Sequence, residues 1–385
     1  MVHQYMHVFL DASKAFDRIR LDKLFQILLK RGFPTCFIKF LINCYFKQDI
    51  CIKWGSETSD YFKGINGIRQ GGVLSPILFT VYIDMLADEL KHSNSGCWIG
   101  HKYVGCITYA DDIVLLCPSA TGLQHMVNVC AQFGSNHDIL FNEKKTVCVN
   151  FDKDNFCPEI TLNGKSLQWE EKAKHVGNVV NRMLTDEDDV FVKKQNFFHQ
   201  VNKMLCDYQG IRDDILIELF GKYCTSYYGC QQWDLRSRHV ESFCKAWNRA
   251  VRRVLRLPYN SHRYMLPVLM GTDSICNVLY KRFLKLCITM KQSKNTTVGF
   301  LYNFFVNDRN SVIARNMFHI TQIFDCNYNA DLNVVLKNVK MHISDDHMAN
   351  SMFLVELLQL RQGALIVDEM NADDINVMIE YVATN

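Results

Sequence analysis

Two adjacent aspartates, Asp111 and Asp112, stand between two apolar runs in the segment ITYADDIVLL. The flanking residues, 107–108 and 113–116, have the β-branched and aliphatic composition of buried strands. Charges beside apolar surface are costly unless another group pairs with them. Asp-Asp is also ordinary turn chemistry, so this segment alone favours a plain hairpin with a solvated turn. Its neighbours in the sequence decide whether the turn is also functional.

A third carboxylate, Asp11, has the same setting, because HVFL (residues 7–10) predicts a short buried strand that ends at it. Strand ends can bring acids that are distant in the sequence to one edge of a sheet. Two carboxylates about 4 Å apart repel each other by roughly 4 kcal/mol at an effective dielectric constant of 20. Divalent cations relieve this repulsion, and Mg²⁺ prefers carboxylate oxygens. We therefore expect a site for two Mg²⁺ ions, or Mn²⁺ in their place, of the kind that assists phosphoryl transfer.

Strand-like and helix-like segments alternate through about the first 150 residues, which predicts an α+β fold with helices on one face of a sheet. Residues 21–30 have the spacing of an amphipathic helix, and Pro76 is placed to open another. From about Lys193 the pattern is mostly helical. Candidate helices there are residues 191–207, 213–228 and 243–257, the last stopped by Pro258.

The segment GIRQGGVLSPILF, residues 67–79, lies between the acids. Its glycines allow close backbone approach, and Gln70 offers an amide that both donates and accepts hydrogen bonds. By itself this pattern favours a structural turn before a helix. It is no P-loop, because no GK[ST] follows.

The sixteen cysteines contain no CxxC or CxC pair, which argues against a zinc cluster and favours buried, reduced thiols. The sequence shows neither a secretory signal nor an apolar run long enough for a membrane span. These features predict a nuclear or cytoplasmic protein that is not secreted and has no membrane partner; they identify no protein partner. A net charge of +3 means that any basic surface is local.

The order of the motifs is the most specific feature of the chain. LDASKAFD, GIRQGGVLSPILF, YADD, FNEKKT and HVG follow one another from about His7 to Val180. This succession resembles the palm motifs of reverse transcriptases, and in particular those of LINE-type (non-LTR) retrotransposons. The resemblance implies a palm with an antiparallel sheet and helices on one face, followed by a mostly helical thumb and C-terminal region.

For catalysis, the resemblance implies that Asp11, Asp111 and Asp112 coordinate the metal ions, with Asp112 the least direct ligand. Lys145 belongs to an N-x-x-K-T motif and would protonate the pyrophosphate leaving group. The alternative for Lys145 is a solvated lysine at a strand edge.

For binding, the resemblance implies that Phe16 packs under the deoxyribose and excludes ribonucleotides, while Gln70 and Gly71 contact the nucleotide and template. His175 and Gly177 would form a turn that grips the primer. Phe16 could instead be a core residue, and Gln70 a turn cap. Asp17 we interpret as a cap of the helix that starts at Leu21.

We divide the chain into a partial fingers and palm domain (residues 1–185), a helical thumb (186–260) and a helical C-terminal region (261–385) of unassigned role. In the thumb, four arginines follow the spacing i, i+3, i+4, i+7 and predict a basic stripe for nucleic acid; the alternative is a solvated helix face. They are Arg249, Arg252, Arg253 and Arg256.

Met1 lies ten residues before Asp11, which leaves no room for the finger motifs that normally precede it. The chain is therefore expected to be a fragment or a relic, with weak polymerase activity by itself. The resemblance implies an RNA-directed DNA polymerase that adds dNTPs to a DNA primer on an RNA template. The alternative is a non-catalytic, repurposed nucleic-acid-binding protein that keeps the palm and thumb as a scaffold.

Overall fold

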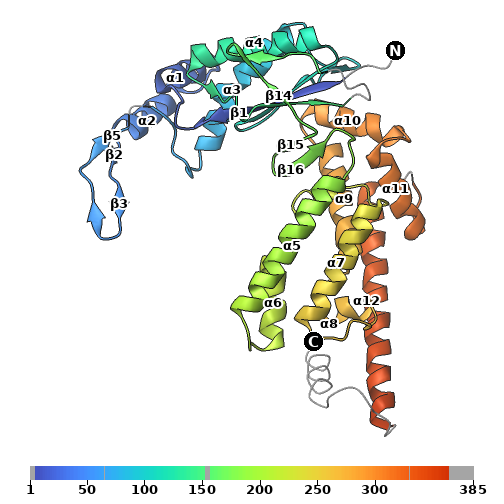
Figure 1. The fold of residues 1–385 in the computed structure, drawn as a ribbon. Coiled ribbons are helices and arrows are strands. Elements are labelled where there is room, and N and C mark those ends of the chain that lie inside the picture. The colour runs from blue at the N-terminus through green and yellow to red at the C-terminus, as the bar shows by residue number, and fades with distance from the viewer. Residues whose placement is uncertain (1–4, 65, 152–156, 329, 364–385) are drawn as a thin grey trace. The chain divides into compact units, whose positions relative to one another are not determined.

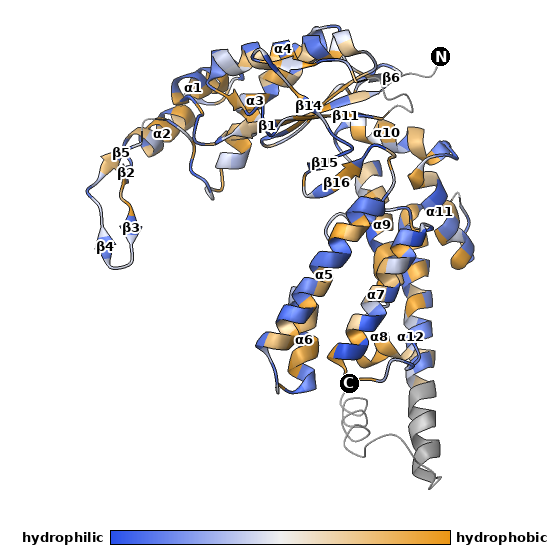
Figure 2. Ribbon diagram, in the orientation of Figure 1, coloured by the Kyte–Doolittle hydropathy of each residue, from blue (hydrophilic) through white to orange (hydrophobic). Residues whose placement is uncertain are grey.

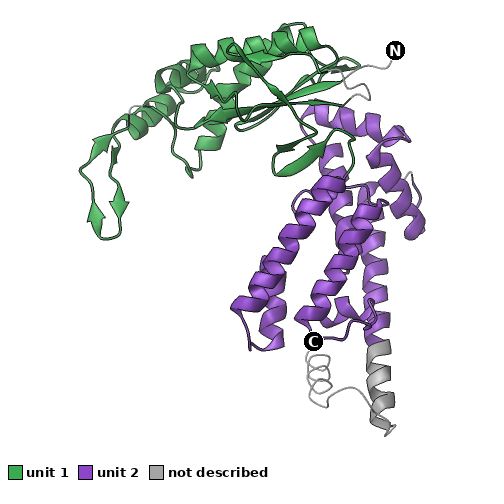
Figure 3. Ribbon diagram, in the orientation of Figure 1, with its two compact units in different colours: residues 1–185 green, residues 186–385 purple. Residues whose placement is uncertain are grey.

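The structure, a computed structural model, describes residues 5–64, 66–151, 157–328 and 330–363. The chain divides into two compact units, residues 1–185 and 186–385 (Figure 3). Each unit has a hydrophobic core of its own. Within the described residues, no helix has the length and apolar character needed to cross a membrane.

The first unit combines a main sheet with helices (Figure 1). Its helices are α1 (Leu21–Lys30), α2 (Thr35–Phe46), α3 (Ser75–His92) and α4 (Ala120–His137). The main sheet is built from β1 (Met6–Ser13), β8 (Cys106–Tyr109), β9 (Asp112–Cys117), β10 (Leu140–Phe141), β11 (Val147–Asn150) and β14 (Gln168–Trp169). Two-stranded pairs are β2 (Asp49–Ile50) with β5 (Phe62–Lys63), β3 (Lys53–Trp54) with β4 (Glu57–Thr58), β6 (Trp98–Ile99) with β7 (Lys102–Tyr103), β12 (Thr161–Leu162) with β13 (Lys165–Ser166), and β15 (Lys172–His175) with β16 (Asn178–Asn181).

Strand β1 lies in the middle of the main sheet, whose order is β14-β11-β1-β9-β8, with β10 also paired to β1. Every pair is antiparallel except β11 with β14. The expected antiparallel sheet is thus found in its central strands. The parallel pair at the edge follows from the long connection between β11 and β14, since a parallel return needs a dozen residues or more.

The two faces of the sheet differ in what covers them. Helices α3 and α4 pack on one face, where Leu10 and Ile113 belong to the main core. On the other face Phe9 and Val114 form a small cluster with Ala173 of β15. Because side chains alternate along a strand, residues two positions away from Phe9 and Val114 also emerge on this second face.

The described part of the second unit is helical. It consists of α5 (Glu187–Asp207), α6 (Asp213–Tyr223), the 3₁₀ turn η1 (Cys230–Gln232), α7 (Arg238–Val254), α8 (Met265–Leu269), α9 (Ile275–Lys291), α10 (Thr296–Asn307), α11 (Val312–Ile323) and α12 (Leu332–Gly363). Side chains from both sides of residue 260 share one core, and the division predicted there stays a prediction.

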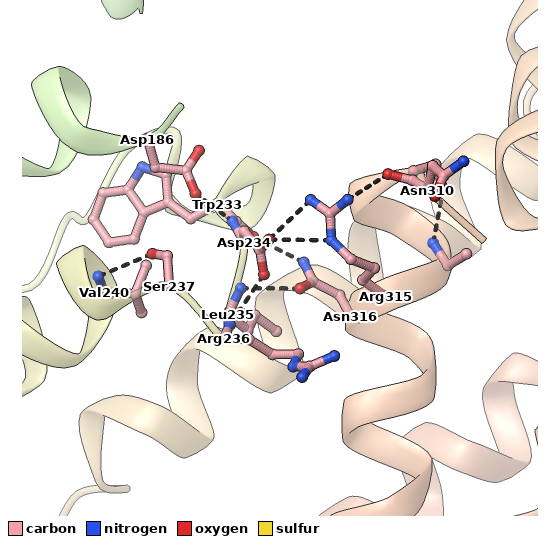
Figure 4. Close-up of polar contacts among 12 residues, drawn as sticks. Asp186, Trp233, Asp234, Leu235, Arg236, Ser237, Val240, Asn310, Arg315 and Asn316 are labelled. Atoms are coloured by element: carbon pink, nitrogen blue, oxygen red, sulfur yellow. Dashed lines mark hydrogen bonds and ion pairs between the residues drawn. The ribbon is translucent and has the colours of Figure 1, made fainter. Parts of the chain in front are cut away.

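A polar network joins η1 to α5 and α11 beside this core (Figure 4). The backbone amide of Asp234 donates to Oδ2 of Asp186, and the guanidinium of Arg315 pairs with Oδ2 of Asp234 at 2.9 Å. Asn316, which is fully buried, donates to the carbonyl of Trp233 at 2.8 Å and accepts from the amide of Leu235 at 2.9 Å. These bonds satisfy backbone groups that burial would otherwise leave unpaired.

Several helix predictions are confirmed, and some bounds are wrong. Helix α1 has the predicted bounds, and Pro76 lies in the first turn of α3. The helix predicted over residues 213–228 ends at Tyr223. The predicted cap for α1 is also wrong, because its N-cap residue is Arg20, which makes no side-chain cap bond.

Helix α7 ends before the last arginine of the predicted basic stripe. Apolar and polar residues lie on different sides of this helix (Figure 2), and Ala246, Trp247 and Val251 are buried. The helix ends at Val254, however, so Arg256 lies outside it with φ +51°. The chain turns there because the amide of Leu257 bonds back to the carbonyl of Arg252 at 2.8 Å, the mark of a Schellman motif.

Candidate active site

Asp11 and Asp112 lie directly opposite each other on neighbouring antiparallel strands. The register of β1 and β9 pairs Leu10 with Ile113 and then Asp11 with Asp112. Both aspartates therefore emerge on the face that carries Phe9, away from α3 and α4. Opposite residues in such a pair have Cβ atoms about 4.5–5.5 Å apart, so the two carboxylates can reach a common ion.

The backbone of Asp11 is fixed from its other side by the turn that precedes β11. The Asp11 amide donates to Oγ1 of Thr146 at 3.2 Å, and its carbonyl accepts from the amide of Asn142 at 2.8 Å. Within the turn, the amides of Thr146 and Lys145 both donate to the carbonyl of Asn142. Three residues of the N-x-x-K-T motif are thus joined by backbone hydrogen bonds. Two of them, Asn142 and Thr146, also fix the strand end that carries Asp11.

Asp111 occupies the exposed turn of the hairpin, beside Ala110, whose φ is +52°. The neighbouring Asp112 is held by a second turn, because the amide of Val176 donates to its Oδ2 at 3.2 Å. Val176 and Gly177 have φ values of +44° and +73° and connect β15 to β16. The predicted primer-grip turn therefore contacts one of the predicted metal ligands.

A cavity of about 330 Å³ opens beside this pair. It is lined by Phe9, Leu10, Asp11, Asp112, Ile113, Lys145, Val147, Glu170, Lys172, Ala173, Lys174 and His175. Asp111 is absent from the lining. Burial lowers the pKa of His175 although the nearby Asp112 carboxylate opposes this, and the lowered pKa favours the neutral imidazole. The structure thus brings four predicted site residues together: Asp11, Asp112, Lys145 and His175.

Phe16, Gln70 and Gly71 belong to a second cluster, formed where the glycine-rich loop meets the turn after β1. The amide of Ile68 donates to the carbonyl of Phe16, and Nε2 of Gln70 donates to Oδ1 of Asp17 at 3.1 Å. Gly67 is required here, because a Cβ at this position would lie 2.7 Å from the carbonyl oxygen of Asp17. Gly71 has φ +79° and open space where a side chain would be.

Residues 3–180 match the family model described as "Reverse transcriptase (RNA-dependent DNA polymerase)". This part of the chain is a reverse transcriptase domain. The resemblance read from the motifs is confirmed over this range, and so is the assignment to non-LTR retrotransposon relatives.

Two relatives come from Drosophila melanogaster. The "Retrovirus-related Pol polyprotein from type-2 retrotransposable element R2DM" is 31% identical over 140 residues, which cover 36% of this chain and 13% of the relative. The "RNA-directed DNA polymerase from mobile element jockey" is 26% identical over 203 residues, which cover 51% of this chain and 22% of the relative. The chain thus spans less than a quarter of the length of either.

The structure also resembles a solved structure of telomerase from Candida tropicalis in complex with a TWJ fragment of telomeric RNA. The identity is 12%, the TM-score is 0.41, and the match covers 79% of this chain and 49% of that chain.

The carboxylate oxygens at this site are suitable ligands for a magnesium ion. Enzymes of this family generally use divalent metals. Mg²⁺ is usually bound through one or two carboxylates, with water and substrate phosphates as further ligands. Asp11 and Asp112 supply two carboxylates on one face. Among the described residues, no three acidic, histidine or cysteine side chains already form a metal-binding group, so Asp111 is not gathered with the other two.

The arginines predicted to bind nucleic acid lie in the second unit, and their side chains have partners there. Arg252 donates to the carbonyl of Ser261 at 2.7 Å, and Arg253 to Oδ1 of Asn202 at 2.8 Å. Arg256 pairs with Asp213 at 3.5 Å, and Arg249 lies over the ring of Tyr259. These contacts orient the guanidinium groups, which are only partly used by them because each has five N–H donors.

Sequence reasoning missed the parts played by Thr146 and Val176. Thr146 is buried, and its hydroxyl holds the strand end of Asp11. The final threonine of the N-x-x-K-T motif was the available signal. Nothing in the sequence indicates that the amide of Val176 reaches Asp112, because that contact depends on the fold.

Proposed function

We propose that this chain is the polymerase part of an RNA-directed DNA polymerase, which adds dNTPs to a DNA primer on an RNA template. The observation that supports this most directly is the pairing of Asp11 with Asp112 at a cavity that also contains Lys145. Membership of residues 3–180 in the reverse transcriptase family gives this arrangement its reaction class.

Asp11, Asp112 and, from the hairpin turn, Asp111 would hold two Mg²⁺ ions, or Mn²⁺. When bound, the ions would supply charge neutralisation at the primer 3′-hydroxyl and at the leaving phosphates. The hydrogen bond from Val176 leaves one oxygen of Asp112 for a metal ion. Lys145, whose backbone is held by Asn142, would give a proton to the leaving pyrophosphate.

The remaining site residues would position the substrates. Phe16 would pack against the sugar of the incoming nucleotide, and Gln70 with Gly71 would contact the nucleotide and the template base. His175 and Gly177 would hold the primer end next to Asp112. In the second unit, Arg249, Arg252, Arg253 and Arg256 would follow the phosphate backbone of the template–primer duplex.

Primer extension tests the proposal. The full chain is incubated with a DNA primer annealed to an RNA template, dNTPs and Mg²⁺, and extension is compared for the wild type and Asp11→Asn. Loss of a group that stabilises charge in the reaction is expected to lower the rate at least about 100-fold. Asp88→Asn is the matched control, because Asp88 is an exposed carboxylate of α3 outside the cavity; its rate should equal that of the wild type.

The same experiment separates the alternative, a non-catalytic nucleic-acid-binding protein. That reading is supported if the wild type binds the template–primer duplex but extends it no faster than Asp11→Asn. Equal extension by both proteins would eliminate the catalytic proposal.

A further inference from the structure

Two cysteine sulfurs meet in the second unit, in a part of the chain that the proposed polymerase chemistry does not use. Cys244 belongs to α7 and Cys276 to the first turn of α9. Their Sγ atoms lie 3.3 Å apart, and both cysteines are free thiols. A disulfide has a sulfur–sulfur distance of about 2.05 Å, so the two sulfurs are already close to bonding distance.

Both thiols line a cleft of about 690 Å³. Cys244 is 8% exposed and Cys276 is partly exposed, so a small molecule in the cleft meets Cys276 first. The cleft also contains Arg263, Tyr280 and His319. This setting differs from that of Cys287 on the same helix, which is fully buried.

The surroundings of Cys276 favour its thiolate. The hydrogen bond between the Cys276 and Cys244 sulfurs and the positive charge of Arg263 lower the pKa of Cys276 against the opposing effect of burial. Cys276 also lies in the first turn of α9, which Ser274 caps by accepting from the amide of Asn277. A helix N-terminus stabilises a thiolate for the same electrostatic reason.

Three acids line the cleft; Glu241 and Asp273 have partners of opposite charge, and Asp346 is the third. Glu241 pairs with Lys245 at 2.7 Å, and Asp273 pairs with Lys281. Glu241 and Asp273 therefore offset the effect of Arg263 on Cys276 less than unpaired charges would.

We propose that Cys276 and Cys244 form a dithiol site that hydrogen peroxide oxidises to a disulfide. The Cys276 sulfur attacks one peroxide oxygen, which breaks the O–O bond and gives a sulfenic acid and hydroxide. The Cys244 sulfur then attacks the Cys276 sulfur and forms the S–S bond. This breaks the S–O bond of the sulfenic acid, whose oxygen leaves as water. The two sulfurs lose two electrons, the peroxide gains them, and the two thiol protons complete two waters.

The consequence is a reversible covalent link between α7 and α9. A thiol reductant restores the two thiols by attacking the disulfide. This site is independent of the proposed polymerase function, because its readout is the oxidation state of the two cysteines.

Peptide mapping tests the proposal on the reduced, full-length wild type. The protein is exposed to hydrogen peroxide for increasing times, blocked with N-ethylmaleimide and digested. Cys206, an exposed cysteine of α5, is the internal reference in the same sample. We expect the peptide that joins Cys244 to Cys276 to form at least about tenfold faster than any oxidised form of Cys206. Equal rates, or disulfides distributed over other cysteines, would overturn the proposal.

Two single substitutions test the order of attack. In Cys244→Ser, dimedone should capture a sulfenic acid at Cys276, because the second thiol is missing. In Cys276→Ser, Cys244 should stay reduced for as long as Cys206 does. Capture at Cys244 in the second variant would contradict the assignment of Cys276 as the thiolate that attacks the peroxide. The wild-type measurement stands whether or not the variants fold.

Discussion

Val176, in the turn between β15 and β16, donates its backbone amide to Oδ2 of Asp112 at 3.2 Å. A β-branched residue is strained at φ +44°, and Val176 has this backbone conformation where it makes the contact. The hydrogen bond comes from the main chain, so the side chain at position 176 is not needed for it. Strain at this position is consistent with a turn whose conformation serves the neighbouring carboxylate.

Replacement of Val176 by glycine should relieve this strain and keep the amide donor. We expect Val176→Gly to raise the free energy of unfolding by about 1 kcal/mol, measured by denaturant titration. Val179→Gly, in the adjoining strand β16 without a positive φ, is the control and should lower it by a similar amount. A loss of stability in both variants would show that Val176 is not strained.

Asp11 and Asp112 repel each other, because like charges directly opposite in an antiparallel pair are destabilising. Without divalent ions, Asp112→Asn should therefore raise the free energy of unfolding by about 0.5–1 kcal/mol. Mg²⁺ should raise the melting temperature of the wild type and of Asp88→Asn, but have a much smaller effect on Asp112→Asn. An equal Mg²⁺ effect on all three proteins would exclude Asp112 as a ligand.

The ring of Phe16 stacks on that of Phe79, with centroids 4.6 Å apart and planes at 12°. Phe79 is fully buried and Phe16 only partly. The stack therefore holds the Phe16 ring in place and leaves an edge of that ring for a substrate. If Phe16 excludes ribonucleotides, Phe16→Val should raise rNTP incorporation relative to dNTP by about tenfold or more. Phe16→Tyr keeps the bulk and should leave the ratio unchanged. Single-nucleotide extension measures both.

The sequence was enough to predict elements whose signals are local. The apolar spacing of residues 21–30 and the proline at position 76 depend on neighbours within a few turns, and α1 and α3 form there. Asp17 shows the limit of such local reasoning. Its side chain is used by Gln70, which is 53 residues away in the sequence, instead of capping α1.

The pairing of strands could not be predicted from local patterns. Motif order implied that Asp11 and the hairpin acids converge, but the register of β1 and β9 decides that Asp112, not Asp111, stands opposite Asp11. A shift of one residue would reverse which face each side chain occupies. The prediction that Arg256 lies within the helix was wrong, because α7 ends in a Schellman turn before it reaches the proline at position 258.

The polar network of the second unit makes its stability depend on pH. Burial raises the pKa of Asp186 to about 6, and the hydrogen bond from the Asp234 amide only partly offsets this. The folded state therefore binds this proton more tightly than the unfolded state, whose carboxyl has a pKa near 3.8. The resulting stabilisation is complete below about pH 4 and is lost as the pH rises through about 6.

Asp186→Asn should remove this dependence, because asparagine keeps an oxygen acceptor for the Asp234 amide and carries no charge. The difference in unfolding free energy between variant and wild type should shift in favour of the variant between pH 4 and pH 7. Asp207→Asn, an exposed carboxyl at the end of the same helix, is the control. A pH-independent difference for Asp186→Asn would contradict the assignment.

Arg256 offers a test in which stability and nucleic-acid binding change in opposite directions. It occupies the left-handed position of the Schellman turn after α7, where glycine is favoured. Its ion pair with Asp213 is long, at 3.5 Å, and the arginine side chain is 60% exposed, so we expect the pair to contribute little. Arg256→Gly should therefore raise the free energy of unfolding by about 1 kcal/mol. If Arg256 also contacts phosphate, the variant should bind a template–primer duplex more weakly, with a salt dependence reduced by about one ion. Arg256→Ala removes the charge without relieving the strain, so it should share the binding defect and lack the gain in stability. Unchanged binding in both variants would remove Arg256 from the proposed nucleic-acid surface.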